Sequence, residues 1–247
     1  MPIKNSSATL AAIRHPLAAL KFKLGDKSAM HEAVIFDSVK HLWGNNADLK
    51  PWKGALLELK NNELVAPNEN KFQTIVGNNL NTSFGKWIYC CIRVTKPETV
   101  IETGVAHGYS SWIMLNALKK NNKGILYSID LPNHDTNSDY NFKDQPTTGW
   151  MVPESLKDRW KLNLGDAKVL LPAILKEIGE LSIFFHDSDH SYEHMKYEFE
   201  TSHPFIINGG LLLSDDVHKN AAFAEHVDKN NLTALQFNKG GAAIIRK

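Results

Sequence analysis

Two short stretches of this chain combine acids with histidines, and each follows an apolar run. One is His-Asp-Ser-Asp-His at 186–190, and the other is Asp215-Asp216. Three carboxylates that converge favour a hard divalent cation, Mg²⁺ more than Zn²⁺. A neutral imidazole beside a metal-held hydroxyl is a natural general base. We therefore expect Asp187, Asp215 and Asp216 as metal ligands and His190 as base, the alternative being solvated or helix-capping acids.

A second chemical feature is the stretch Val-Ile-Glu-Thr-Gly-Val-Ala-His-Gly-Tyr-Ser-Ser at 100–111. It predicts a buried strand ending near Glu102, a tight turn with Gly104 and Gly108, and a helix from Ser110. Glycines let a ligand approach the backbone, and the helix start offers free N–H groups. A dinucleotide fold would have G-x-G-x-x-G there. The carboxylate before the turn would repel a pyrophosphate and suits a cationic ligand without phosphate, such as S-adenosylmethionine.

Acidic residues recur at the ends of five expected strands. Besides the stretches above, Asp130 and Asp166 end or closely follow two strands. In an open parallel sheet, ligands bind outside the carboxyl ends of the strands, so these acids should line one crevice. Asp130 would accept hydrogen bonds from ribose hydroxyls, and Asp166 would face the adenine. Asp166 also fits the simpler role of a helix N-cap.

The elements that must position these residues alternate along the second two thirds of the chain. Continuous apolar strands alternating with helices predict a parallel sheet covered on both faces, and Lys239-Gly240-Gly241 joins a closing pair as a hairpin. The expected strands are 99–102, 124–130, 160–164, 181–186, 210–214, 232–237 and 242–246, and the expected helices are 87–94, from 110, 167–178, 192–202 and 221–229. Residues 1 to about 80 lack strong strand signals.

Composition narrows the class of protein. The chain has 247 residues, is 43% hydrophobic and carries a formal net charge of +1, which argues against nucleic-acid binding. No apolar run approaches the ~20 residues of a membrane span. The neighbouring Cys90 and Cys91 are expected as reduced thiols. Because charged residues and Pro16 interrupt the N-terminal apolar stretch, we expect no signal peptide and a cytoplasmic protein.

These motifs together resemble those of the class I S-adenosylmethionine-dependent methyltransferases, in particular the macrocin-type and related small-molecule O-methyltransferases. The resemblance covers roughly residues 84–247. The motifs that carry it are E-T-G-V-A-H-G-Y-S at 102–110, the strand-ending Asp130, N-L-G-D at 163–166, H-D-S-D-H-S-Y at 186–192 and G-G-L-L-L-S-D-D at 209–216. It implies an α/β, Rossmann-like, mostly parallel sheet of seven strands with an antiparallel last strand and helices on both faces.

The same resemblance implies roles for particular residues. Metal-dependent relatives hold Mg²⁺ through an acid after the fourth strand and a pair after the fifth, which correspond to Asp187, Asp215 and Asp216. Some relatives use a histidine base, matching His190, and others use the second acid of a D-x-D pair, matching Asp189. The cofactor contacts that it implies are Glu102, Gly104, Gly108, Ser110, Asp130 and Asp166.

The sequence thus predicts a helical or irregular N-terminal segment over 1–83, serving as a cap or oligomer contact, and a cofactor-binding domain over 84–247. The expected reaction is metal-assisted O-methylation of a sugar, polyketide or phenolic hydroxyl. Tyr140, Phe142, Trp150 and Met151 would form either a wall for the acceptor or the small core of a lid. The alternatives are an NAD-dependent oxidoreductase and a non-catalytic binding protein that kept the cofactor pocket. A homo-oligomer is compatible with the sequence.

Overall fold

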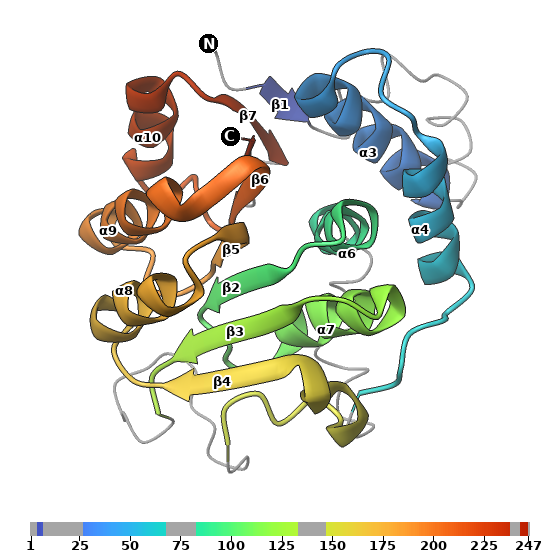
Figure 1. The fold of residues 1–247 in the computed structure, drawn as a ribbon. Coiled ribbons are helices and arrows are strands. Elements are labelled where there is room, and N and C mark those ends of the chain that lie inside the picture. The colour runs from blue at the N-terminus through green and yellow to red at the C-terminus, as the bar shows by residue number, and fades with distance from the viewer. Residues whose placement is uncertain (1–3, 7–26, 68–82, 133–146, 238–242, 247) are drawn as a thin grey trace.

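Eight strands form one central sheet in the computed structural model, which describes residues 4–6, 27–67, 83–132, 147–237 and 243–246 (Figure 1). The strand order is β1-β7-β8-β6-β5-β2-β3-β4. All neighbouring pairs are parallel except the two that β8 makes, with β6 and β7. The strands are β1 (Lys4–Ser6), β2 (Thr99–Thr103), β3 (Ile125–Asp130), β4 (Trp160–Leu164), β5 (Leu181–His186), β6 (Ile206–Ser214), β7 (Thr233–Phe237) and β8 (Ala243–Arg246).

The predicted α/β class, the mostly parallel sheet and the reversed last strand are confirmed, but the expected number of seven strands is wrong. The eighth strand is β1, which adds to the edge of the sheet beside β7. It is three residues long, too short for a period-two pattern to stand out in the sequence. Strand β6 also begins four residues earlier than predicted, because Ile206 pairs with Leu181 before a register shift.

Helices cover both faces of the sheet, as the continuous apolar strands predict (Figure 1). Along β5, Ile183 and Phe185 belong to one hydrophobic cluster, while Phe184 between them belongs to the other. This alternation follows from the two-residue repeat of a strand. The helices are α3 (Lys27–Trp43), α4 (Lys50–Lys60), α6 (Ser83–Thr95) and α7 (Tyr109–Asn121) on the first face, and α8 (Ala167–Ile178), α9 (Tyr192–Ser202) and α10 (Ala222–Asn230) on the second, with short 3₁₀ turns at Glu154–Arg159 and His203–Phe205.

The helices before residue 83 pack onto the same core as the rest of the sheet. Trp52 of α4 stacks on Trp87 of α6 with ring centroids 5.2 Å apart, and Trp43 of α3 lies edge-on to Trp52 at 5.0 Å. A separate role for residues 1–83 stays a prediction, and most of the first 26 residues lie outside the described part. No helix among the described residues has the length and apolar content to cross a bilayer.

The sheet brings the chemically interesting segments to one edge. Thr103, at the end of β2, is in register with Ile129 of β3 and with His186 of β5. His186 is in turn in register with Ser214 at the end of β6. The turn after β2 and the loops after β5 and β6 therefore leave the sheet side by side, as expected for parallel strands.

Candidate functional site

The glycine turn after β2 touches the loop after β5. Gly104 has a φ of +83° and Gly108, the N-cap of α7, a φ of +92°, which are left-handed conformations that favour glycine. A β-carbon on Gly104 would lie 2.0 Å from the carbonyl oxygen of Asp187. The backbone amide of Asp187 donates to Thr103 O at 2.8 Å. The expected cofactor turn, residues 104–108, is thus in direct backbone contact with the loop after β5. We call this loop, residues 187–191, the reaction loop because it carries Asp187 and His190.

Glu102 lies beneath this turn rather than on its surface. Its carboxylate is fully buried and accepts hydrogen bonds from the hydroxyls of Ser110, Ser111 (2.5 Å) and Ser128 (2.7 Å). Burial raises the pKa of Glu102 to about 7, against the effect of these hydrogen bonds. Glu102 and Ser110 therefore tie the turn and the start of α7 to the sheet, and their predicted direct contact with a cofactor stays a prediction.

Asp130, at the end of β3, holds the outer part of the same turn. Its Oδ2 accepts from the backbone amides of Val105 at 3.0 Å and Ala106 at 2.8 Å, and its Oδ1 accepts from Leu131 at 2.8 Å. The side chain is half-buried at the carboxyl edge of the sheet. It has lone pairs left for a ribose hydroxyl, so the predicted contact is compatible with the geometry.

Asp166 takes the simpler of its two predicted roles. It is the N-cap of α8, and its carboxylate accepts from the backbone amide of Lys168 at 2.8 Å. The residue is exposed at the carboxyl edge beside β4. Its contact with an adenine stays a prediction.

The segment from 147 to 153 packs over the glycine turn. Gly149 N donates to Ala106 O at 2.8 Å, and the indole N–H of Trp150 donates to Nδ1 of His107 at 2.9 Å. Met151 is fully buried in the core cluster, so it is a packing residue rather than part of an acceptor wall. Tyr140 and Phe142 lie outside the described residues.

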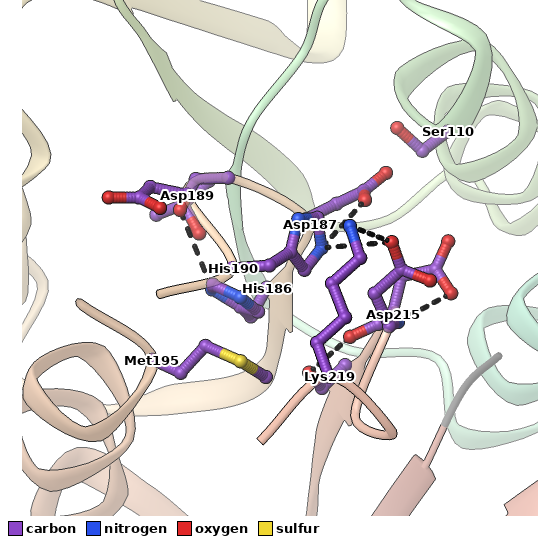
Figure 2. A network of polar contacts seen from close by, with 12 residues as sticks. Ser110, His186, Asp187, Asp189, His190, Met195, Asp215 and Lys219 are labelled. Carbon is purple, nitrogen blue, oxygen red and sulfur yellow. Dashed lines mark hydrogen bonds and ion pairs between the residues drawn. The ribbon is translucent and has the colours of Figure 1, made fainter. Parts of the chain in front are cut away.

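The loops after β5 and β6 bring their carboxylates close together, and Lys219 joins them (Figure 2). Burial, followed by repulsion from Asp215, raises the pKa of Asp187 well above its ordinary value. Burial also raises the pKa of Asp215 to about 6. The ammonium of Lys219 lies 2.6 Å from Asp216 Oδ2, and Asp216 has a left-handed φ of +49°.

These residues do not fit the three-carboxylate magnesium site in this arrangement. One of the three predicted ligands, Asp216, is already paired with the ammonium of Lys219. Within the described ranges, no group of three or more His, Cys, Asp or Glu side chains is placed to hold a metal ion. A lysine thus provides positive charge where the sequence predicts a cation.

His190 faces the acidic cluster, whereas Asp189 does not. Nε2 of His190 lies 3.7 Å from Asp187 and 4.0 Å from Asp216, and this buried atom has no hydrogen-bond partner in the described structure. Burial, assisted by the nearby His186 and Lys219, lowers the pKa of His190 to about 4. The exposed Asp189 lies on the other side of His190 in Figure 2, and its two oxygens accept from Ser191 N and Oγ.

Sequence reasoning missed two residues of this site, Lys219 and Glu198. Lys219 follows Asp216 by three residues in a turn, a spacing that is common by chance in a chain with many lysines. Glu198 lies four residues after His194 on α9. Because residues four apart share a helix face, this spacing could have indicated a contact between the two side chains. Its contacts with β2 and β5 depend on tertiary structure and leave no local pattern.

A mostly parallel sheet with a reversed last strand, a glycine turn after β2 and acids at the carboxyl edge define the class I methyltransferase fold. Residues 101–217 match a protein family described as a methyltransferase domain. This span runs from β2 to just beyond β6 and includes the glycine turn and both acidic loops. This match confirms the predicted resemblance to the S-adenosylmethionine-dependent methyltransferases.

Solved structures share the fold at low sequence identity. A Staphylococcus aureus protein described as a caffeoyl-CoA O-methyltransferase has a TM-score of 0.53 and 15% identity over 81% of this chain and 100% of its own. The O-methyltransferase TomG of Streptomyces achromogenes, solved with S-adenosylmethionine, has a TM-score of 0.51 and 14% identity over 77% and 95%. A Klebsiella pneumoniae protein described as an O-methyltransferase has a TM-score of 0.50 and 15% identity over 87% and 96%. Comparison with curated protein sequences finds no significant match.

Proposed function

We propose that this protein transfers a methyl group from S-adenosylmethionine to a hydroxyl oxygen of a small molecule. The observation that carries the proposal is the backbone contact between Gly104 and Asp187, which joins the glycine turn to the loop of His190. The methyltransferase domain match supports the donor chemistry. The names of the structural relatives, which are O-methyltransferases and include one complex with S-adenosylmethionine, support the cofactor and an oxygen acceptor.

The residues that would hold the cofactor are the turn 104–108 and, at the ribose hydroxyls, Asp130, and the bound cofactor would supply the methyl group. The acceptor hydroxyl lies at Nε2 of His190, the buried atom without a hydrogen-bond partner. As the new O–CH₃ bond forms, the S–CH₃ bond breaks and its electron pair stays on sulfur, which gives S-adenosylhomocysteine. His190 takes the hydroxyl proton, a contribution of about 10²–10⁴ in rate. Orientation of the two reactants supplies much of the remainder.

Magnesium has no step in this mechanism because the three carboxylates are not arranged as one ligand set. A bound divalent cation would supply Lewis-acid activation of the acceptor oxygen. Here the ammonium of Lys219 lies in the acidic cluster instead and forms an ion pair with Asp216. Asp189 is a poorer base than His190 because both of its oxygens are held by Ser191.

The variant His190→Ala tests the proposed base. It should bind S-adenosylmethionine with wild-type affinity but release S-adenosylhomocysteine about 10²-fold or more slowly with a hydroxylated acceptor. The measurement is S-adenosylhomocysteine release over a panel of sugars, polyketides and phenols. The matched control is His218→Ala, which removes an exposed imidazole 3.7 Å from Asp216. Near-normal turnover of His190→Ala would remove this residue from the mechanism.

A further inference from the structure

A second buried carboxylate lies directly behind the reaction loop. Glu198 of α9 has no exposed surface and accepts four side-chain hydrogen bonds. Its Oε2 accepts from Thr103 Oγ1 and from His186 Nδ1, each at 2.6 Å. Its Oε1 accepts from His194 Nε2 at 2.9 Å and from Ser188 Oγ at 3.0 Å. These donors come from the ends of β2 and β5, from the loop after β5 and from α9 itself.

This set of donors keeps Glu198 charged inside the protein. Burial alone would raise its pKa, but the hydrogen bonds from His186 and His194 outweigh burial and lower the pKa to about 2. An ionised carboxylate only accepts hydrogen bonds, so the proton between Glu198 and His186 lies on Nδ1 of the imidazole. This hydrogen bond fixes the orientation of the His186 ring, in the way that a carboxylate orients a histidine in many enzyme sites.

The ring of His190 packs against the oriented ring of His186. The two rings meet edge to face, with centroids 5.3 Å apart and planes at 78°. Figure 2 shows His186 next to His190, on the side away from Asp215 and Lys219. Asn220 donates to the backbone oxygen of His190 at 2.9 Å, a hydrogen bond that does not orient the ring.

We propose that Glu198 is a positioning residue that acts through His186 to fix the ring of His190 toward the acidic cluster. The chain of contact runs from the Glu198 carboxylate to Nδ1 of His186, and from the His186 ring edge to the His190 ring. As a role in catalysis, this inference rests on the proposed function. As a statement about geometry, it can be tested without an acceptor.

The direct test is NMR of the His190 ring in the full chain, with the ring ¹H–¹³C signal assigned by its absence from His190→Ala. Glu198→Gln removes the charge, and His186→Asn keeps an N–H that can donate to Glu198 but removes the ring. Both variants should displace or broaden the His190 signal. Glu200→Gln is the matched control, because Glu200 lies on the same helix but pairs with the exposed Lys229. It should leave the signal in place.

Two outcomes would overturn the inference. One is an unchanged His190 signal in Glu198→Gln. The other is an unchanged signal in His186→Asn, which would show that Glu198 supports the fold without acting through His186. If Glu198→Gln does not fold, His186→Asn alone decides, because it leaves the carboxylate with its donors.

Kinetics separate this inference from the proposed function. With an acceptor found in the panel, both variants should lower kcat at least about tenfold, while the Kd for S-adenosylmethionine stays within about twofold of wild type. Equal losses in kcat and in cofactor binding would indicate a merely structural role and would contradict the proposal. If the wild type methylates no acceptor, the proposed function is in doubt, whereas the NMR result still decides whether Glu198 positions His190.

Discussion

At the scale of single residues, two buried glutamates show how the donors around a carboxylate set its charge. Glu102 is surrounded by serine hydroxyls, and its pKa is raised to about 7 because burial outweighs these neutral donors. Glu198 receives two imidazoles, and its pKa is lowered to about 2. Hydrogen bonds from groups that can carry charge stabilise a carboxylate more strongly than neutral ones. The first glutamate therefore supports the glycine turn, and the second supplies fixed charge behind the reaction loop.

The raised pKa of Glu102 predicts how stability depends on pH. Between about pH 4.5 and 7 the folded protein holds a proton that the unfolded chain has lost, so this group lowers the free energy of unfolding as pH rises. In the wild type, the contribution of Glu102 to the free energy of unfolding should fall by on the order of 1–3 kcal/mol between pH 5 and 8. The variant Glu102→Gln should lack this fall. Urea denaturation of both proteins at the two pH values measures it. An identical pH dependence in wild type and variant would contradict the assignment.

Lys219 predicts the outcome of a metal titration. Its ammonium pairs with Asp216 and lies near two further carboxylates whose pKa values are raised. Lys219→Met removes this positive charge and leaves the three carboxylates without a counter-charge, so Mg²⁺ should bind at least about tenfold more tightly than in the wild type. Calorimetric titration with MgCl₂ checks this. Tight Mg²⁺ binding by the wild type, with the same affinity in the variant, would contradict this prediction. It would show that the ammonium of Lys219 moves away when the metal binds.

At the scale of elements, the contact between the turn after β2 and the loop after β5 is the tightest constraint on the site. In Gly104→Ala, the new methyl group would meet a backbone oxygen at 2.0 Å and would force a left-handed φ on alanine. We expect a loss of about 3 kcal/mol or more in the free energy of unfolding, together with loss of cofactor binding.

The matched control for this substitution is Gly179→Ala. Gly179 ends α8 with a φ of +74°, but a β-carbon there would have no atom within 4 Å. Only the conformational penalty remains, about 1 kcal/mol. Thermal or urea denaturation compares the two variants. Equal losses would mean that backbone conformation, and not the contact with Asp187, makes Gly104 necessary.

Much of the element structure could be predicted from the sequence, because the strands of a covered parallel sheet are continuous apolar runs. The predicted helix at 167–178 and the predicted strands at 160–164 and 181–186 agree with α8, β4 and β5. Strand β1 was missed because three edge residues carry no periodic signal. The sequence placed Asp187, Asp215, Asp216 and His190 at one edge, but the pairing of Lys219 with Asp216 depends on a turn geometry that spacing does not specify.

At the scale of the whole molecule, one sheet carries both the expected cofactor turn and the reaction loops. The N-terminal helices close the first face of this sheet through the Trp43, Trp52 and Trp87 rings. They pack against α6 on the face of the sheet opposite α9. The absence of a nucleic-acid partner, the cytoplasmic location and a homo-oligomer remain predictions from the sequence.

The class of enzyme depends on which nucleoside cofactor binds at the carboxyl edge of the sheet. The predicted alternative, an NAD-dependent oxidoreductase, would use the same edge and the same Asp130. The geometry of the turn differs from G-x-G-x-x-G in having Glu102 buried beneath it and two left-handed glycines four residues apart. Binding of the two cofactors therefore separates the two classes of enzyme without knowledge of the acceptor.

The most direct measurement is calorimetric titration of the full chain with S-adenosylmethionine and, separately, with NADH. We expect saturable binding of S-adenosylmethionine at one site per chain, with no heat of binding for NADH at the same concentrations. Saturable binding of NADH without binding of S-adenosylmethionine would contradict the central claim that this protein is a methyltransferase.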